Sequence, residues 1–277
     1  MAAPVTLDLH WLSAGYCLQV EALTRRGRPW RVMRYPAGFA LLIHPTRGPV
    51  LFDTGYAPRV AEICRRWPWA LYALVTPMRI GREDSAASRL QSLGIPPETV
   101  REVIVSHFHA DHVGGLRDFR AARFRFAPEA HAALHGLTGL RALRRAYLPD
   151  LLPSDFAARA APFPDADWRP APPDLAPFRT ALDVFGDGSA LALRVPGHAP
   201  GQIALVVRTP VGRVLLAADA GWSSAALRDG APPHPLATLA FSDRHAERRS
   251  FRLLGEFLRR HPDVRVHASH DGAGESG

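Results

Sequence analysis

The sequence predicts an α/β (α+β) protein, in which short buried strands alternate with helices. Residues 103–106, 190–195 and 213–218 are runs of apolar and β-branched side chains, as expected of buried strands. Residues 85–93 and 242–260 instead repeat apolar side chains at helical spacing. With 277 residues and 47% hydrophobic side chains, the chain has enough material for a sizeable core in one or two domains.

In the first half, glycine and proline residues separate short extended runs at residues 5–12, 17–23, 39–43 and 49–52, which we expect to be strands. A helix is expected at 59–67. A second helix is expected at 85–93, because its apolar positions end directly before Gly94, a residue typical of helix C-termini. Residues 127–180 are rich in Ala and Pro and are expected to form short helices and loops.

In the second half, strands are expected at residues 181–185, 190–195, 202–209 and 213–218. Residues 242–260 form the clearest helix of the chain. Ser242 or Asp243 is its expected N-cap, because either side chain can accept hydrogen bonds from the first backbone N–H groups. Its expected inner face carries Phe251, Leu254, Phe257 and Leu258.

A dense group of metal-binding residue types follows the strand expected at 103–106. His107, His109, Asp111 and His112 fall within six residues, ahead of a Gly-Gly turn. Imidazole suits zinc and iron, and a carboxylate adds the charge that holds a second cation. In an extended segment residues two apart point the same way, so this loop can serve two ions, with His107 and His109 on one, and Asp111 and His112 on the other. The alternative is a polar surface loop that happens to contain three histidines.

The H-x-H-x-D-H pattern of residues 107–112 resembles the metallo-β-lactamase superfamily. This resemblance implies three further ligands in the order His, Asp, His. His198, Asp219 and His270 are the candidates, and each follows a strand-like run. The resemblance then assigns His107, His109 and His198 to a first metal ion, Asp111, His112 and His270 to a second, and Asp219 to both as a bridge.

The same resemblance implies the architecture, an αββα sandwich of two mixed β-sheets packed face to face with helices outside. It covers nearly the whole chain, so we expect a single domain over residues 1–277 with two similar halves, roughly 1–180 and 181–277. Residues 50–56 and 215–222 fit two halves, because each reads as a strand followed by Asp-x-Gly and an aromatic residue. A chance match of a common turn is the alternative.

The resemblance also implies a dinuclear metal hydrolase. Its cofactors would be two divalent ions, with zinc expected first and iron, manganese or cobalt also compatible with these ligands. Zinc lowers the pKa of bound water from about 16 to about 7, so a metal-bridging hydroxide could attack a carbonyl carbon. Asp219 would bridge the ions, and Asp111 would pass a proton to the leaving oxygen or sulfur. Asp53 is similar to the family's acid that orients a metal-bound histidine; a turn cap is the alternative.

Within the superfamily, residues 196–202 and 269–271 are similar to the N-acyl-homoserine lactonase branch. The ligand set contains no cysteine, which argues against the branch that hydrolyses β-lactams. Where those lactonases have a tyrosine three residues after the bridging Asp, this chain has Trp222, which offers an indole N–H but no acidic hydroxyl. Trp222 and Tyr56 are both expected at the substrate pocket.

The expected function is therefore hydrolysis of a small-molecule lactone or related carboxylic ester, as in quorum quenching. Two alternatives stay open. One is a thioesterase of the glyoxalase II type, which shares the His-Asp-His ligands and would be favoured by basic surface near the site. The other is a metal-containing protein that binds a signalling molecule without turning it over.

The net charge of +8 is carried by arginine alone, because the chain has no lysine. The arginines are scattered along the sequence, so nucleic-acid binding is not expected.

No stretch approaches the about 20 apolar residues that span a membrane, and the first 12 residues do not resemble a signal peptide. Cys17 and Cys64 are too far apart in sequence to suggest a disulfide framework, which fits a cytoplasmic location.

Residues 67–78 form an apolar and aromatic segment whose role the sequence leaves open. It could line an acyl-chain channel, act as a lid, form a homodimer contact or be a buried helix.

Overall fold

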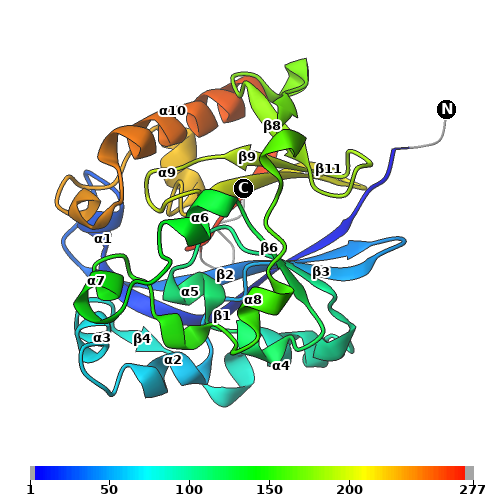
Figure 1. Ribbon diagram of the computed structural model, residues 1–277. Coiled ribbons are helices and arrows are strands. Elements are labelled where there is room, and N and C mark those ends of the chain that lie inside the picture. Colours follow the sequence, from blue (N-terminus) through cyan, green and yellow to red (C-terminus); the bar gives the residue numbers. More distant parts are fainter. Residues whose placement is uncertain (1–3, 272–277) are drawn as a thin grey trace.

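In the computed structural model, which describes residues 4–271, two six-stranded β-sheets pack face to face (Figure 1). The first sheet has the order β4-β1-β2-β3-β5-β6 and contains β1 (Asp8–Val20), β2 (Val32–His44), β3 (Gly48–Phe52), β4 (Met78–Arg79), β5 (Glu102–Ile104) and β6 (Arg123–Arg125). The second has the order β12-β11-β10-β9-β8-β7 and contains β7 (Arg169–Pro170), β8 (Thr180–Asp183), β9 (Ala190–Arg194), β10 (Ile203–Thr209), β11 (Gly212–Ala218) and β12 (Arg265–Ala268). Both sheets mix parallel and antiparallel pairs.

Helices cover the outer faces of both sheets, which confirms the expected αββα sandwich (Figure 1). The α-helices are α1 (Glu21–Thr24), α2 (Pro58–Ile63), α3 (Ala70–Val75), α4 (Ala86–Ser92), α5 (Ala110–Val113), α6 (Pro128–Ala132), α7 (Gly139–Leu143), α8 (Phe156–Arg159), α9 (Ser224–Asp229) and α10 (Arg244–Arg260). Short 3-10 helices are η1 (Arg82–Asp84), η2 (Pro97–Thr99), η3 (Leu116–Asp118), η4 (Pro149–Leu151), η5 (Asp165–Asp167), η6 (Pro173–Leu175) and η7 (Ala237–Ala240). None of the helices formed by residues 4–271 combines the length and the apolar character needed to cross a membrane.

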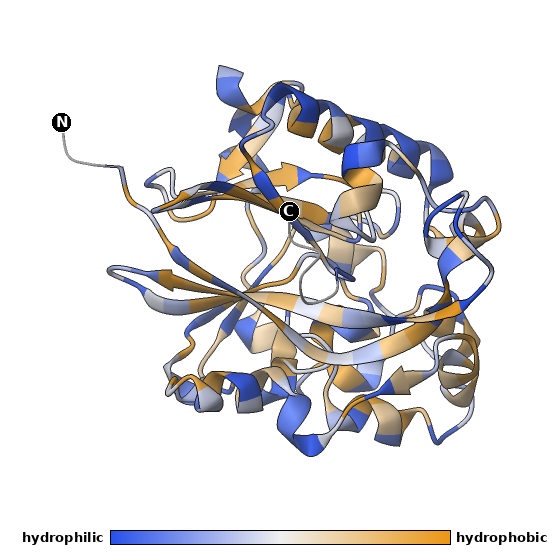
Figure 2. Ribbon diagram, turned by 180° about the vertical axis from the view of Figure 1, so that it is seen from behind, coloured by the Kyte–Doolittle hydropathy of each residue, from blue (hydrophilic) through white to orange (hydrophobic). Residues whose placement is uncertain are grey.

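Three apolar clusters fill the interfaces between these layers. Leu42 of β2 packs with Leu216 of β11 in the cluster between the two sheets. Leu41, the residue before Leu42 in β2, lies instead in the cluster under the helices of the first half, because successive side chains of a strand point to opposite faces. Leu215 packs with Phe257 of α10 on the outer face of the second sheet. Figure 2 shows the result, with apolar strands between the layers and a hydrophilic outer face on α10.

Two strands expected separately, 5–12 and 17–23, are joined in the single strand β1. The pairing of β1 with β2 shifts register between Ser13 and Tyr16, where Gly15 has a φ of +73°. Such an irregularity bends a strand without ending it, and glycine tolerates this backbone conformation. The expected strand also continued too far, since the chain turns into α1 at Glu21.

The helix expected at 242–260 begins at Arg244, and Asp243 rather than Ser242 is its N-cap. The Asp243 carboxylate accepts hydrogen bonds from the backbone N–H groups of His245 at 2.8 Å and Ala246 at 2.9 Å. The helix expected at 85–93 corresponds to α4, whose cap Ser85 accepts from the N–H of Ser88 at 3.2 Å. Both boundaries follow from local capping chemistry.

The topology brings four strand ends to one edge of the sandwich. β3 and β5 are parallel neighbours in the first sheet, and β11 and β12 are parallel neighbours in the second. Because parallel strands end at the same edge, Asp53 and His107 follow the first pair, while Asp219 and His270 follow the second. β3 and β11 occupy equivalent places in their sheets. β3 is antiparallel to β2 and parallel to β5, and β11 is antiparallel to β10 and parallel to β12. Both strands are followed by the repeated Asp-x-Gly pattern.

Candidate metal centre

The loop after β5 and the short helix α5 carry the histidine-rich motif. His107 lies on the loop, His109 is the N-cap residue of α5, and Asp111 and His112 lie within the helix. The extended geometry expected for residues 107–111 therefore ends at His109. The N–H and the hydroxyl of Thr54 both donate to the carbonyl of His112, at 2.9 and 2.8 Å, and tie α5 to the end of β3.

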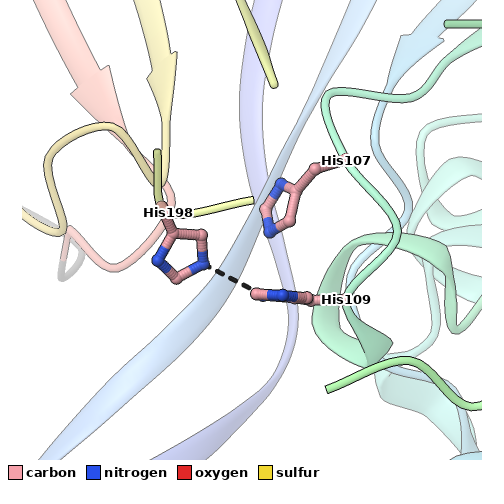
Figure 3. Close-up of side chains that lie close together, drawn as sticks. All are labelled: His107, His109 and His198. Atoms are coloured by element: carbon pink, nitrogen blue, oxygen red, sulfur yellow. Dashed lines mark hydrogen bonds between the residues drawn. The ribbon is translucent and has the colours of Figure 1, made fainter. Parts of the chain in front are cut away.

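All seven expected ligands converge from the two halves of the chain. Their ligand atoms form three groups within 4.8 Å: His107, His109 and His198; His107, His112 and Asp219; and Asp111, Asp219 and His270. Figure 3 shows the first group, with the three imidazole rings directed toward one another. Nε2 of His198 and Nδ1 of His109 lie 2.9 Å apart.

Asp219 stands at the centre of the cluster. One carboxylate oxygen, Oδ1, lies 3.2 Å from Nε2 of His112. The other, Oδ2, lies 3.2 Å from Nε2 of His198 and 3.5 Å from Nε2 of His270. A single carboxylate thus faces histidines of the motif loop and of the two later strand ends.

Several buried ligand atoms of the cluster make no hydrogen bond to the described residues, as expected of atoms that bind a metal ion. Nε2 of His107, Nε2 of His112 and Oδ1 of Asp219 are buried and make no hydrogen bond within the part of the chain that the structure describes. Nε2 of His107 has neither a hydrogen-bond nor an ion-pair partner within residues 4–271, which costs about 1–3 kcal/mol, whereas Nε2 of His112 and Oδ1 of Asp219 lie 3.2 Å apart as an ion pair without hydrogen-bond geometry. Divalent cations bound by imidazole nitrogen and carboxylate oxygen would satisfy all of them.

The histidines of the cluster differ in protonation, because burial dominates the pKa at His107 and His109, whereas neighbouring carboxylates raise the pKa at His112 and His270, where metal binding would displace a proton. Burial lowers the pKa of His107 and His109 well below the usual value, and the charge of neighbouring histidines adds to this effect. Both rings are therefore neutral, the form of histidine that binds metals. Burial alone would raise the pKa of Asp219, but His112, His270 and His198 hold it well below its usual range. For His270, Asp219 and Asp111 overcome the effect of burial and raise its pKa to about 9.

Asp53 and Ser106 hold the two buried histidines of the motif. Oδ2 of Asp53 lies 2.8 Å from Nδ1 of His112, which leaves Nε2 of that ring facing the cluster. The backbone N–H of Ser106 donates to Asp53 at 2.7 Å and its hydroxyl at 2.6 Å. The same hydroxyl lies 3.0 Å from Nδ1 of His107. Asp53 adopts a φ of +62°, a conformation uncommon outside glycine, to reach these partners.

Comparison with known proteins identifies the family. A model of the metallo-beta-lactamase superfamily matches residues 35–259. The chain belongs to this superfamily.

One relative of this chain is the N-acyl homoserine lactonase AttM of Azorhizobium caulinodans, which is 29% identical over 191 residues. These residues cover 68% of this chain and just under two thirds, 66%, of that protein. AttM of Rhizobium radiobacter is 26% identical over 238 residues, which cover 85% of this chain and 82% of the relative. A solved N-acyl homoserine lactone hydrolase, with the product N-hexanoyl-L-homoserine at its catalytic metal centre, superposes with a TM-score of 0.72. That similarity covers 97% of this chain and 94% of the other at 20% identity, so it concerns the fold.

Sequence reasoning missed several groups around the metallo-β-lactamase motif. The carbonyl of Pro36 accepts a hydrogen bond from Nδ1 of His270 at 2.8 Å, and the carbonyl of Arg145 accepts one from His109. No sequence signal marks a backbone carbonyl that comes from a distant segment. Ser106 could have been noticed, because a polar residue at the end of an apolar strand needs a partner when it is buried.

The two residues expected at the substrate pocket have different surroundings. Trp222 is partly exposed and packs edge-on against His198, with ring centroids 5.9 Å apart. Phe241, which the sequence did not single out, contacts both rings, at 5.0 Å from His198 and 5.4 Å from Trp222. Tyr56 is fully buried, with its hydroxyl 3.3 Å from that of Tyr72, and burial raises its pKa well above the usual value. Tyr56 therefore packs in the core of the first half rather than lining an open pocket.

Proposed function

We propose that the protein is a dinuclear metal-dependent hydrolase that opens a lactone or related carboxylic ester, with N-acyl homoserine lactones as its substrate class. The observation that carries the proposal is the convergence of seven His and Asp side chains, several of whose buried ligand atoms have no hydrogen-bond partner. Relatives named as N-acyl homoserine lactonases support the substrate class. Hydrolysis of such a signal would amount to quorum quenching.

His107, His109 and His198 would hold one ion, Asp111, His112 and His270 the second, and Asp219 both. Zinc is the first candidate because five of these ligands are imidazoles; iron, manganese and cobalt accept the same set. When bound, such ions lower the pKa of water and polarise a carbonyl group.

The protein's own residues would position these ligands and move a proton. Asp53 and Ser106 keep the ring of His112 in place through hydrogen bonds of 2.6–2.8 Å. Oδ2 of Asp111 lies 3.7 Å from Nε2 of His270. In hydrolysis, Asp111 would take a proton from the attacking water and deliver it to the leaving alkoxide oxygen as the ester C–O bond breaks. Trp222 and Phe241 would contact the apolar part of the substrate beside His198.

One observation favours thioester hydrolysis as a second candidate. The backbone N–H of Asp243 donates to the carbonyl of Gly197 at 2.9 Å, so the first turn of α10 abuts the loop of His198. α10 carries six arginines: Arg244, Arg248, Arg249, Arg252, Arg259 and Arg260. Positive charge on a helix that begins beside the site would attract an anionic thioester.

The deciding experiment compares an N-acyl homoserine lactone with a thioester of the same acyl chain, using protein whose metal content has been measured. The lactonase proposal expects faster turnover of the lactone with about two ions per chain. Faster turnover of the thioester would favour the second candidate. Saturable binding of the lactone without turnover, by protein loaded with metal, would indicate a signal-binding protein.

We also propose a cytoplasmic location, which the state of the cysteines supports. Cys17 and Cys64 are both buried as free thiols. Burial raises the pKa of the Cys64 thiol to about 11, so this side chain is unreactive at neutral pH. Free structural cysteines are typical of reducing compartments. Fractionation of cells expressing the native gene, followed by immunodetection, tests the location.

A further inference from the structure

Exposed apolar side chains concentrate at one end of the first sheet. We call six of them the apolar edge: Trp30, Val32, Met33, Trp67, Leu74 and Val75. Their exposed fractions range from 37% to 75%, and they make up six of the eleven large hydrophobic residues exposed within residues 4–271. Isolated apolar side chains are normal on a protein surface, but a cluster of this kind marks an interaction site.

Strand pairing and one hydrogen bond bring these residues together. Gln19 of β1 pairs with Met33 of β2, and its side-chain amide donates to the carbonyl of Val75 at 2.8 Å. Met33 therefore lies on the face of the β1–β2 strand pair that is next to the end of α3. Trp67 lies three residues before α3, and Leu74 and Val75 are the last two residues of that helix. In Figure 1, α3 and α1, which lies just before β2, occupy the same edge of the molecule.

The apolar edge continues toward the metal centre. Trp30 packs edge-on against His234, with ring centroids 5.8 Å apart. The following segment exposes Leu236 and Leu239, at 57% and 63%. Phe241, two residues later, contacts His198. The surface thus runs from α3, across the start of β2, to the aromatic wall of the site.

Arginines are dense in the segment that carries Trp30, Val32 and Met33. Residues 21–34 contain five arginines and one carboxylate, Glu21, which is buried and paired with Arg28 and Arg31. Arg26 and Arg34 form no ion pair within residues 4–271. Arg26 also lines a cavity of about 1190 Å³ beside α10, together with Arg248, Arg252 and Arg259.

We propose that the apolar edge docks on the surface of an anionic lipid bilayer. Tryptophan favours the boundary between headgroups and acyl chains, Leu and Val insert below it, and arginines bind anionic headgroups while their stems lie along apolar surface. A second copy of this chain fits less well, because a two-fold contact would bring the same arginines face to face. The proposal does not depend on the reaction catalysed at the metal centre.

The test is flotation of the full chain with vesicles of phosphatidylcholine alone or mixed with phosphatidylglycerol. Binding is expected only to the anionic vesicles and should weaken as salt increases. The double variant Leu74→Ser/Val75→Ser should bind about tenfold more weakly. Arg26→Gln/Arg34→Gln should lose about fivefold per arginine.

Val211→Ser and Arg101→Gln are matched controls and should bind as the unaltered protein does. Val211 is 74% exposed, close to Leu74 at 75%, but lies in the β10–β11 turn. Equal weakening in these controls, or no binding to anionic vesicles at low salt, would overturn the proposal. So would sedimentation showing a dimer that Leu74→Ser/Val75→Ser converts to monomer, since a second copy would then cover this surface.

Discussion

Asp219 is the residue whose loss should disturb the metal centre most, because its two oxygens face three histidines from both halves of the chain. Among the carboxylates of residues 4–271, Asp219 alone belongs to two of the three ligand groups, and Asp219→Ala removes it. We expect metal content to fall by about half or more and turnover by about a thousandfold. Metal analysis by mass spectrometry and steady-state kinetics check this, with exposed Asp229→Ala as control. Full retention of metal and activity would remove the bridging role.

Trp222 tests the choice between lactone and other esters. Its ring contacts His198 and Phe241, but an indole has no acidic hydroxyl to offer a substrate carbonyl. Trp222→Tyr should raise kcat/KM for the lactone by about tenfold, the effect of about one added hydrogen bond. Trp222→Phe keeps an aromatic wall without a hydroxyl and should show no such gain. An unchanged or lower rate in Trp222→Tyr would count against this idea.

Glu247 should make folding stability depend on pH. It is buried at the first turn of α10, and burial raises its pKa from 4.5 to about 7. A folded-state pKa above the unfolded value means that the protonated carboxyl favours folding. This stability is fully present below pH 4.5 and is lost as pH rises through about 7.

Glu247→Gln imitates the protonated form at every pH. We expect it to add about 1–2 kcal/mol to the free energy of unfolding at pH 8 and to leave stability near pH 4.5 unchanged. Thermal unfolding followed by circular dichroism at both pH values measures the difference, with exposed Glu98→Gln as control. An equal effect at both pH values would contradict the assignment.

At the scale of elements, Gly197 couples α10 to the metal centre. Gly197 has a φ of +137°, and a Cβ atom there would overlap the backbone of Glu247 in the first turn of the helix. Gly197→Ala should therefore displace the loop of His198, destabilise the fold by about 2–4 kcal/mol and lower metal content.

Gly188→Ala is the matched control for this prediction. Gly188 also has a positive φ, +74°, but has open space around the position of a Cβ atom. It should lose about 1 kcal/mol of stability from backbone strain and keep its metal. Metal content measured on both variants separates the two effects. Equal metal loss would show that the close approach of α10 is unimportant.

At the scale of the whole molecule, metal ions would link the two sheets. His107 follows a strand of the first sheet, whereas Asp219 and His270 follow strands of the second. Ligands that bind only the folded state stabilise it by about 4 kcal/mol at a thousandfold excess over Kd. Removing the metal with a chelator should therefore lower Tm by about 10 °C.

Asp219→Ala serves as the control for the effect of the chelator. Because this variant would already have lost its bridging ligand, the chelator should change its Tm much less. Re-addition of zinc should restore Tm in the unaltered chain. A chelator that leaves Tm unchanged while removing the metal would contradict a structural contribution of the ions.

The amino-acid sequence by itself determined those parts of the molecule whose pattern repeats over neighbouring residues. The apolar spacing of residues 242–260 predicted α10, and the buried runs before His107 and Asp219 predicted β5 and β11. The seven candidate ligands could also be named from the sequence, because the H-x-H-x-D-H pattern resembles the metallo-β-lactamase superfamily and that resemblance implies a later His, Asp and His.

Only the tertiary structure decided which distant groups meet. Pro36 reaches His270 across 234 residues, Tyr56 is buried against Tyr72, and Gln19 links Met33 to Val75. It also brought exposed apolar residues from segments 30–33 and 67–75 to one edge. The physical reason is that these contacts depend on strand register and on the docking of layers, which arise from the burial of the whole core and leave no periodic signal in any single segment.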